Sequence, residues 1–72
     1  METLEFQLRD EFIELNQLLK LSGICDSGGA GKALVAEGLV KVDGKKELRK
    51  TAKIRAGSLV KIGNISITIL PA

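Results

Sequence analysis

The chain has 72 residues, 44% of them hydrophobic and 28% charged, which is typical of one small folded domain. It contains no His, Trp or Tyr, which almost excludes histidine catalysis, histidine metal sites and aromatic base-stacking platforms. Its single cysteine cannot form a disulfide within the chain. The net charge of +2 divides unevenly, because residues 1–31 carry two basic and six acidic side chains, whereas residues 32–72 carry nine and three. The excess of basic residues over 32–72 predicts a surface that binds an anionic polymer such as nucleic acid. The alternative is that these lysines only form a solvated surface.

Two patterns divide the first third of the chain. Hydrophobic and polar residues alternate at its start, which predicts a half-buried strand over about residues 3–9 with an apolar face of Leu4, Phe6 and Leu8. The spacing then becomes helical and predicts a helix over about residues 12–22, with a buried side that includes Leu15, Leu18 and Leu19. Gly23 ends this helix.

A second helix is predicted over about residues 28–37. Asp26 and Ser27 are favourable N-cap residues, and Gly38 stands where many helices end in a left-handed glycine. Glycine destabilises a helix by about 1 kcal/mol relative to alanine. The glycines at the start of this helix therefore require either tight packing or close approach of a ligand, and they are Gly28, Gly29 and Gly31.

The remaining segment, residues 39–70, has a period of two and predicts several short strands. Asp43 and Gly44 are a strong hairpin signal, with a return strand over residues 46–49. The last strand is predicted to place three isoleucines on one face and Ser66 and Thr68 on the outward face. One strand, two short helices and a strand meander together predict an α+β fold, with the helices packed on a small, mainly antiparallel sheet.

Three groups of residues fail the requirements of catalytic or nucleotide sites. The glycines before Lys32 are not a Walker loop, because Asp26 occupies the first glycine position and Ala33 the hydroxyl position. Cys25 has no His or second Cys beside it, which favours a small packing residue. The acidic residues without a catalytic partner, predicted to form a solvated helix face, are Asp10, Glu11 and Glu14. We therefore predict no catalytic residues, no cofactor and no metal.

Basic residues are concentrated after the predicted hairpin. Six of the eleven residues over 45–55 are Lys or Arg, and Glu47 is the only acidic residue among them. Edge-strand lysines that discourage aggregation account for one or two of the six. The others predict contacts with several phosphates and an affinity that falls steeply with salt.

The spacing of residues over 14–62 resembles the S4 RNA-binding domain family. The residues that carry the resemblance are Leu15, Asn16, Leu19, Gly23, Ile24, Ser27, Lys32, Leu34, Val35, Gly38, Val40, Lys41, Val42, Asp43, Gly44, Ile54 and Gly57. Each match is weak alone, but the joint spacing is specific, and the length is similar to that of small stand-alone S4-like proteins of bacteria. The resemblance implies that residues 1–72 form one S4-like (αL) domain, which binds RNA across the helices and an adjoining loop.

The resemblance also assigns roles to individual residues. Ser27 matches the helix cap, Lys32 the basic residue of the second helix, and Lys41 the basic position between two valines. Together with the basic run, the predicted RNA-binding set is Ser27, Lys32, Lys41, Lys45, Lys46, Arg49, Lys50, Lys53 and Arg55.

Some positions depart from the pattern of the family. Glu14 replaces a basic residue, Gly28 replaces an arginine, and Lys50 with Thr51 replaces a common Pro-Ser pair. We expect the basic run to compensate for these changes and to move the binding surface toward the hairpin.

Non-catalytic binding of structured RNA, such as ribosomal or transfer RNA, through its phosphate backbone is the leading prediction for function. The alternative is a protein-interaction adaptor that adds an exposed sheet edge, formed by the last strand, to a partner's sheet. No signal peptide or membrane-spanning run is evident, so we expect a cytoplasmic protein without membrane association. We also expect a monomer.

Overall fold

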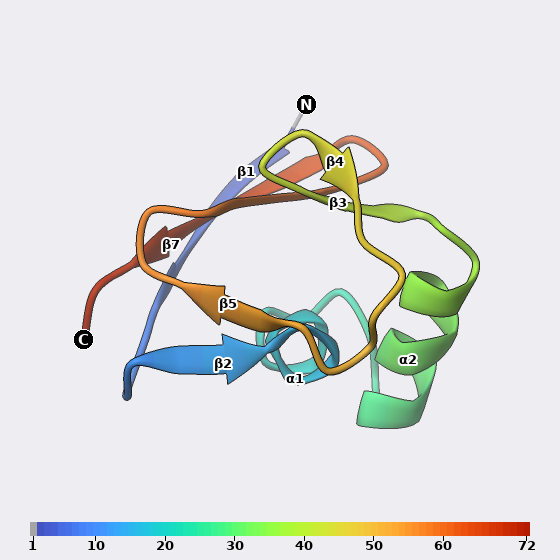
Figure 1. Cartoon of the computed structure of the whole chain (residues 1–72), viewed down its shortest axis with the longest axis horizontal. Coiled ribbons are helices and arrows are strands. Elements are labelled where there is room, and N and C mark those ends of the chain that lie inside the picture. Colours follow the sequence, from blue (N-terminus) through green and yellow to red (C-terminus); the bar gives the residue numbers. More distant parts are fainter. Residues whose placement is uncertain (1) are drawn as a thin grey trace.

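The computed structural model describes residues 2–72, and its larger sheet has five strands in the order β1-β7-β6-β3-β4 (Figure 1). These strands are β1 (Glu2–Gln7), β3 (Val40–Val42), β4 (Lys45–Lys46), β6 (Leu59–Ile62) and β7 (Ile65–Leu70). β1 runs parallel to β7, and the other three pairings are antiparallel. The prediction of a small, mainly antiparallel sheet is confirmed.

The last strand, β7, lies inside this sheet between β1 and β6. Its backbone groups are paired on both sides, so the prediction that this strand offers an edge to a protein partner is wrong. The interior position of β7 also buries Ser66, whose side chain points away from the core. Ser66 is only 7% exposed, although the sequence predicts that it faces outward. The reason is that Thr3 and Lys61 flank it in register on the neighbouring strands.

A second sheet consists of two short antiparallel strands, β2 (Phe12–Glu14) and β5 (Lys53–Arg55). The helix predicted from residue 12 therefore begins three residues later, as α1 (Leu15–Leu21). Phe12 and Ile13 are of types that favour strands when a partner strand is available, and Ile13 lies opposite the buried Ile54. This long-range pairing outweighs the helical spacing of the local sequence.

The second helix, α2 (Gly28–Ala36), has both predicted caps. The Oγ atom of Ser27 accepts a hydrogen bond from the backbone N–H of Ala30 at 3.2 Å. Gly38 follows the helix with φ of 76°, a left-handed conformation that glycine adopts without steric cost. The predicted bounds are thus confirmed to within one residue.

Helices α1 and α2 approach each other closely at Gly31. A Cβ atom at this position would lie 2.8 Å from the carbonyl oxygen of Asn16 in α1, which is too close for any side chain. Tight packing of α1 against α2 therefore explains Gly31, one of the three glycines at the start of the second helix. Gly28 and Gly29 face no such contact, because an added Cβ would meet its nearest neighbours at 3.5 Å or more.

The predicted hairpin turn is present between β3 and β4. Asp43 and Gly44 both have positive φ, 53° and 84°, as a two-residue type I′ turn requires, and Val42 lies opposite Lys45. The return strand ends at Lys46, so the prediction of a strand over residues 46–49 is wrong. Beyond Glu47, whose backbone N–H donates to Val40, the chain leaves the sheet and runs toward the start of α1.

The core lies on one face of the five-stranded sheet. Leucines of α1, Val35 of α2 and Ile54 of β5 are buried with the inward residues of the sheet, and Figure 1 shows the helices and the β2–β5 sheet below the larger one. The inward sheet residues include Val40, Val60, Ile62, Ile67 and Ile69. Among residues 2–72, no helix or second sheet packs on the other face of this sheet. No helix within residues 2–72 has the length and apolar character needed to cross a bilayer.

Candidate nucleic-acid interface

A shallow, open depression of about 430 Å³ lies beside β5. It is lined by Arg49, Thr51, Ala52, Lys53 and Arg55. Three of these five residues carry a positive charge and a fourth carries a hydroxyl group. Such an open, polar hollow suits the oxygens of a phosphate group, which accept charge-assisted hydrogen bonds from Arg and Lys.

The loop over residues 49–52, which forms much of this lining, is attached to the start of α1. The backbone N–H of Leu15 donates to the carbonyl of Ala52 at 2.9 Å. The next amide, that of Asn16, donates to the carbonyl of Lys50 at 3.1 Å. Because α1 has no side-chain N-cap, these loop carbonyls satisfy its first two amides. The loop therefore has a fixed position between α1 and β5.

Phe12 holds two of the cations from the neighbouring strand. The Nζ atom of Lys53 lies 5.0 Å from the centroid of the Phe12 ring, and the Cζ atom of Arg55 lies 5.5 Å from it. The two basic residues flank Ile54, which points into the core, so both side chains project outward from β5. Each cation–π contact contributes about 0.5–1 kcal/mol at an exposed site, and the ring therefore orders both cations beside the depression.

Arg49 differs from the other cations because a carboxylate already pairs with it. Its Nε atom lies 3.3 Å from an Oε atom of Glu47, and its backbone N–H donates to the same oxygen at 3.1 Å. The Arg49 side chain is 80% exposed and that of Glu47 only 20%. Hydrogen bonds from Arg49 lower the pKa of Glu47, and the carboxylate in turn raises the pKa of Arg49. The pair places the guanidinium at the depression but offsets part of its charge.

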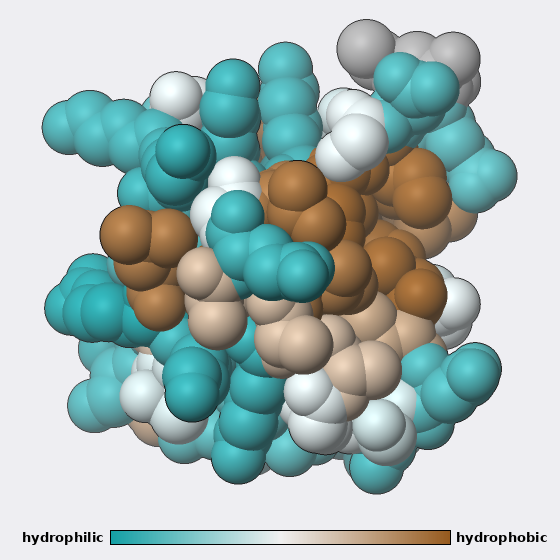
Figure 2. Space-filling model, turned by 90° about the vertical axis from the view of Figure 1, so that its right-hand side faces the viewer, coloured by the Kyte–Doolittle hydropathy of each residue, from teal (hydrophilic) through white to brown (hydrophobic). Residues whose placement is uncertain are grey.

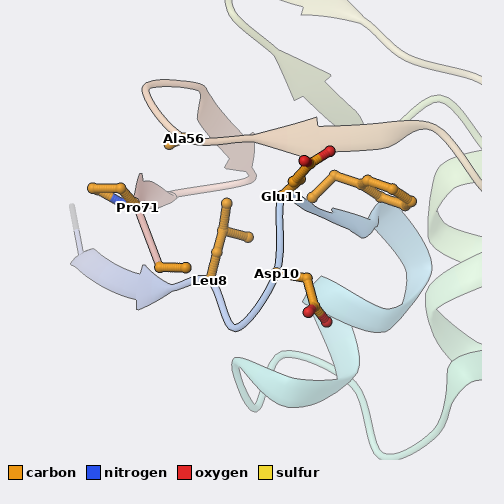
Figure 3. A pocket seen from close by; sticks show the side chains of 7 residues that line it. Leu8, Asp10, Glu11, Ala56 and Pro71 are labelled. Carbon is orange, nitrogen blue, oxygen red and sulfur yellow. The ribbon is translucent and has the colours of Figure 1, made fainter.

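A larger hollow of about 590 Å³, which Phe12 also lines, does not suit phosphate. Figure 3 shows Leu8 and Pro71 together on one side of it and the carboxylates of Asp10 and Glu11 on the other. Carboxylates repel phosphate, so this hollow is not part of the basic surface. Asp10 and Glu11 precede β2 and Glu14 ends it, so the prediction that these residues lie on a helix is wrong. Asp10 and Glu11 are exposed as expected, but Glu14 is half-buried.

Cys25 is a free, partly buried cysteine that packs against the core. Burial raises the pKa of its thiol, and the charge of Asp26 raises it further. Both effects disfavour the thiolate, which agrees with the interpretation of Cys25 as a packing residue. Within residues 2–72, no three His, Cys, Asp or Glu side chains lie close enough together to hold a metal ion.

A family model described as the S4 domain matches residues 6–70, which is nearly the whole chain. The chain belongs to the S4 domain family. YbcJ of Escherichia coli (strain K12) is 47% identical to it over 58 residues, which cover 81% of this chain and 83% of YbcJ. The YbcJ protein of Shigella flexneri matches with the same values.

Solved structures of S4-like proteins have the same architecture. The solution structure of YbcJ from E. coli, described as revealing an αL motif involved in RNA-binding, matches with a TM-score of 0.68 and 41% identity. The match covers 97% of this chain and 87% of that one. The crystal structure of 30S ribosomal protein S4e from Thermoplasma acidophilum matches with a TM-score of 0.60 and 29% identity, over 81% of this chain and 31% of the longer ribosomal protein. The predicted S4-like α+β fold is therefore confirmed.

Within this S4 domain, the nine residues of the predicted RNA-binding set fall into three groups. The group at the depression and its loop consists of Arg49, Lys50, Lys53 and Arg55. The group in the β3–β4 hairpin consists of Lys41, Lys45 and Lys46. The group on α2 consists of Ser27 and Lys32. All nine residues are exposed, and three of the first group, Arg49, Lys53 and Arg55, line a common hollow.

Two residues outside the predicted set belong to these surfaces of the S4 domain. Phe12 contacts two cations of the first group, but no local pattern indicates its pairing with β5. Lys61 lies directly opposite Lys41 across β3 and β6. Its alternation with Val60 and Ile62 indicates an outward side chain, so a signal for this residue is present in the sequence.

Proposed function

We propose that this protein is a non-catalytic RNA-binding module, which holds the phosphate backbone of structured RNA in the depression around Arg49, Lys53 and Arg55. One observation carries the proposal: three cations surround one open hollow, on a loop and a strand whose positions α1 and Phe12 fix. A rigid cluster of this kind loses little side-chain freedom when it binds phosphate. The similarity to YbcJ, whose αL motif is described as involved in RNA-binding, supports the assignment.

Structured RNA is the target class that these side chains favour. The described site has one partly exposed aromatic ring, Phe12, and its other contacts are charges, so it is better suited to a folded backbone than to splayed single-stranded bases. Ribosomal RNA or transfer RNA therefore fits the site, and a neighbour in fold that is a 30S ribosomal protein supports this choice. Such RNA is cytoplasmic in bacteria, and the proposal places the protein there.

The affinity should depend strongly on salt. Each phosphate that the protein neutralises adds roughly 0.9 to the slope of log K against log salt for a duplex. Three to four contacts would weaken binding roughly 40- to 150-fold between about 0.05 M and about 0.2 M salt. Lys50, which is exposed in the same loop, supplies the fourth contact in this estimate.

The decisive experiment compares two double variants that remove the same charge. Lys53→Gln/Arg55→Gln removes two cations of the depression, and Arg9→Gln/Lys20→Gln removes two exposed cations elsewhere in the chain. Fluorescence anisotropy with a labelled RNA hairpin at several salt concentrations gives the affinity and the salt slope. We expect the first variant to bind about tenfold or more weakly, with a slope reduced by roughly 1.8, and the second to bind as the wild type does.

Two results would contradict the proposal. Equal loss in both variants would mean that net charge, and not the depression, determines binding. Unchanged affinity and slope in Lys53→Gln/Arg55→Gln would mean that phosphates do not occupy the depression.

A further inference from the structure

Three lysines form a row across neighbouring strands of the larger sheet. Lys41 in β3 lies directly opposite Lys61 in β6 on one side and opposite Lys46 in β4 on the other. Val40 and Ile62, which neighbour Lys41 and Lys61 in their strands, are buried in the core, so these two lysines project from the uncovered face of the sheet. All three lysines are exposed.

Figure 2 keeps the vertical axis of Figure 1 and shows hydrophilic side chains projecting from the top of the molecule, where β3 and β4 lie. The aliphatic part of the Lys46 side chain packs beside Gly38, because its Cδ atom would lie 3.2 Å from a Cβ atom added at that glycine. The amine of Lys46 therefore lies beside Gly38, at the end of α2.

The protein itself does not neutralise this row. Like charges directly opposite each other on a sheet destabilise it. Within residues 2–72, the one ion pair closer than 4.0 Å joins Arg49 and Glu47, and none involves the row. Asp43, two residues after Lys41, uses its Oδ1 atom to accept a hydrogen bond from the backbone N–H of Leu59 at 2.9 Å, and Glu47, next to Lys46, pairs with Arg49.

Protection of a sheet edge does not explain the row either. Lysines on an edge strand prevent a second chain from pairing with it, and Lys46 in β4 fits that role. Lys41 and Lys61 lie in β3 and β6, which are paired on both sides and have no free edge. Two mutually repelling lysines in interior strands therefore indicate an anionic ligand.

The dimensions of the row suit a nucleic-acid backbone. Neighbouring strands are about 4.8 Å apart, so three strands span roughly 10 Å. In double-stranded DNA each strand carries one charge per roughly 3.4 Å of helix axis, so a row of this length can meet more than one phosphate. Flexible lysine side chains can follow that spacing on an open sheet face.

The row is separate from the depression beside β5. Lys53 and Arg55 project outward from the smaller β2–β5 sheet, on the side opposite the buried Ile54. Lys41 and Lys61 project outward from the larger sheet, and the core lies between the two sheets. No residue of the row lines the depression.

We propose that the open face of the five-stranded sheet, around Lys41, Lys46 and Lys61, is a second phosphate-binding surface, so that one protein chain holds two RNA segments at once. This inference rests on the proposed binding of RNA at the depression. In this proposal the protein bridges two helical segments of RNA, whereas the depression alone would bind a single segment.

The experiment measures bridging between two short RNA hairpins, one labelled with a fluorescence donor and one with an acceptor. The proteins are the wild type, the row variant Lys41→Gln/Lys61→Gln, the depression variant Lys53→Gln/Arg55→Gln and the charge-matched control Arg9→Gln/Lys20→Gln. Sedimentation determines the oligomeric state and the number of hairpins bound per chain. A second row variant, Lys41→Thr/Lys61→Thr, keeps good strand formers at both positions in case the first does not fold.

We expect the wild type and the control to bind two hairpins per chain and to produce energy transfer. The row variant and the depression variant should each keep one hairpin and bind the second about tenfold or more weakly, so that most of the energy transfer is lost. Excess protein should abolish the transfer in the wild type, because each hairpin then occupies a separate chain.

Other results separate the two proposals. One hairpin per wild-type chain, with unchanged affinity in both row variants, would overturn the second surface and leave the depression intact. Energy transfer that persists in both row variants because the protein dimerises would also overturn it. Loss of all binding in the row variants, together with normal binding in the depression variant, would overturn the proposed site at the depression. A wild type that binds no hairpin would overturn both proposals.

Discussion

Replacement of Gly31 by alanine tests the close approach of α1 and α2. The added Cβ atom would lie 2.8 Å from the carbonyl oxygen of Asn16 and 3.4 Å from its Cα atom. The clash is with backbone, so rotation of a side chain cannot relieve it. Asn16 is 1% exposed, and its own N–H is bonded to Lys50, so α1 cannot shift without disturbing the loop of the depression.

The expected loss of stability follows from two opposing terms. Overpacking costs about 1–3 kcal/mol, and the better helix propensity of alanine returns up to about 1 kcal/mol. Gly29→Ala is the matched control, because its Cβ atom would meet only the Oγ atom of Ser27, at 3.8 Å. Both variants change glycine to alanine in the same helix, so the propensity and unfolded-state effects largely cancel in the comparison. The difference between them should be about 2 kcal/mol in favour of Gly29→Ala.

Urea unfolding measures this difference directly, and thermal unfolding should show it as a difference in Tm of roughly 8–16 °C for a domain of this size. Because the clash acts on the attachment of the loop, Gly31→Ala should also bind RNA more weakly than Gly29→Ala. A Gly31→Ala variant that is as stable as Gly29→Ala would refute the reasoning, since the helices would then separate at no cost.

Three further predictions concern single residues. Lys61→Thr should stabilise the protein by about 0.2–1 kcal/mol by removing repulsion from Lys41, and the gain should shrink at high salt; an equal gain at all salt concentrations in urea unfolding would argue against electrostatics. Glu47→Gln should free Arg49 and steepen the salt slope of RNA binding by at most about 0.9, an effect that should vanish in an Arg49→Gln background. Because the pKa of Glu47 is lowered, the pair with Arg49 should persist at neutral pH and be lost only as the pH falls below the usual glutamate range. Ser27→Ala should cost about 1 kcal/mol in thermal unfolding and Ser27→Gly only a few tenths; equal effects would mean that the cap is unimportant.

The parts of the fold that local chemistry determines could be predicted from the sequence. Three such features depend only on residues next to them in the chain. They are the left-handed turn at Asp43 and Gly44, the capping hydroxyl of Ser27 and the glycine that follows α2, Gly38. The strand of Phe12 could not be predicted, because its partner lies some forty positions later and the local spacing is equally helical. The parallel pairing of β1 with β7 likewise joins the two ends of the chain.

In the candidate site too, the local sequence predicts some features and long-range contacts determine the others. Composition and charge indicate that the basic run over residues 45–55 forms a polar surface, and period-two alternation indicates that Lys53 and Arg55 share a face. Which cations meet depends on contacts that the local sequence does not encode. The attachment of residues 49–52 to α1 brings Arg49 to β5, and Phe12 joins them from another strand.

Strand alternation also explains why the basic part of the chain has two surfaces. In β5 the apolar residue is Ile54, so Lys53 and Arg55 project from the smaller sheet. In β3 and β6 the valines and isoleucine are inward, so Lys41 and Lys61 project from the larger one. Since the two sheets cover different sides of a single core, the rule that buries the hydrophobic residues also separates the cations. A chain with a net charge of only +2 can thus present two positive surfaces, because some of its acidic side chains, such as those of Asp10 and Glu11, lie at a different hollow.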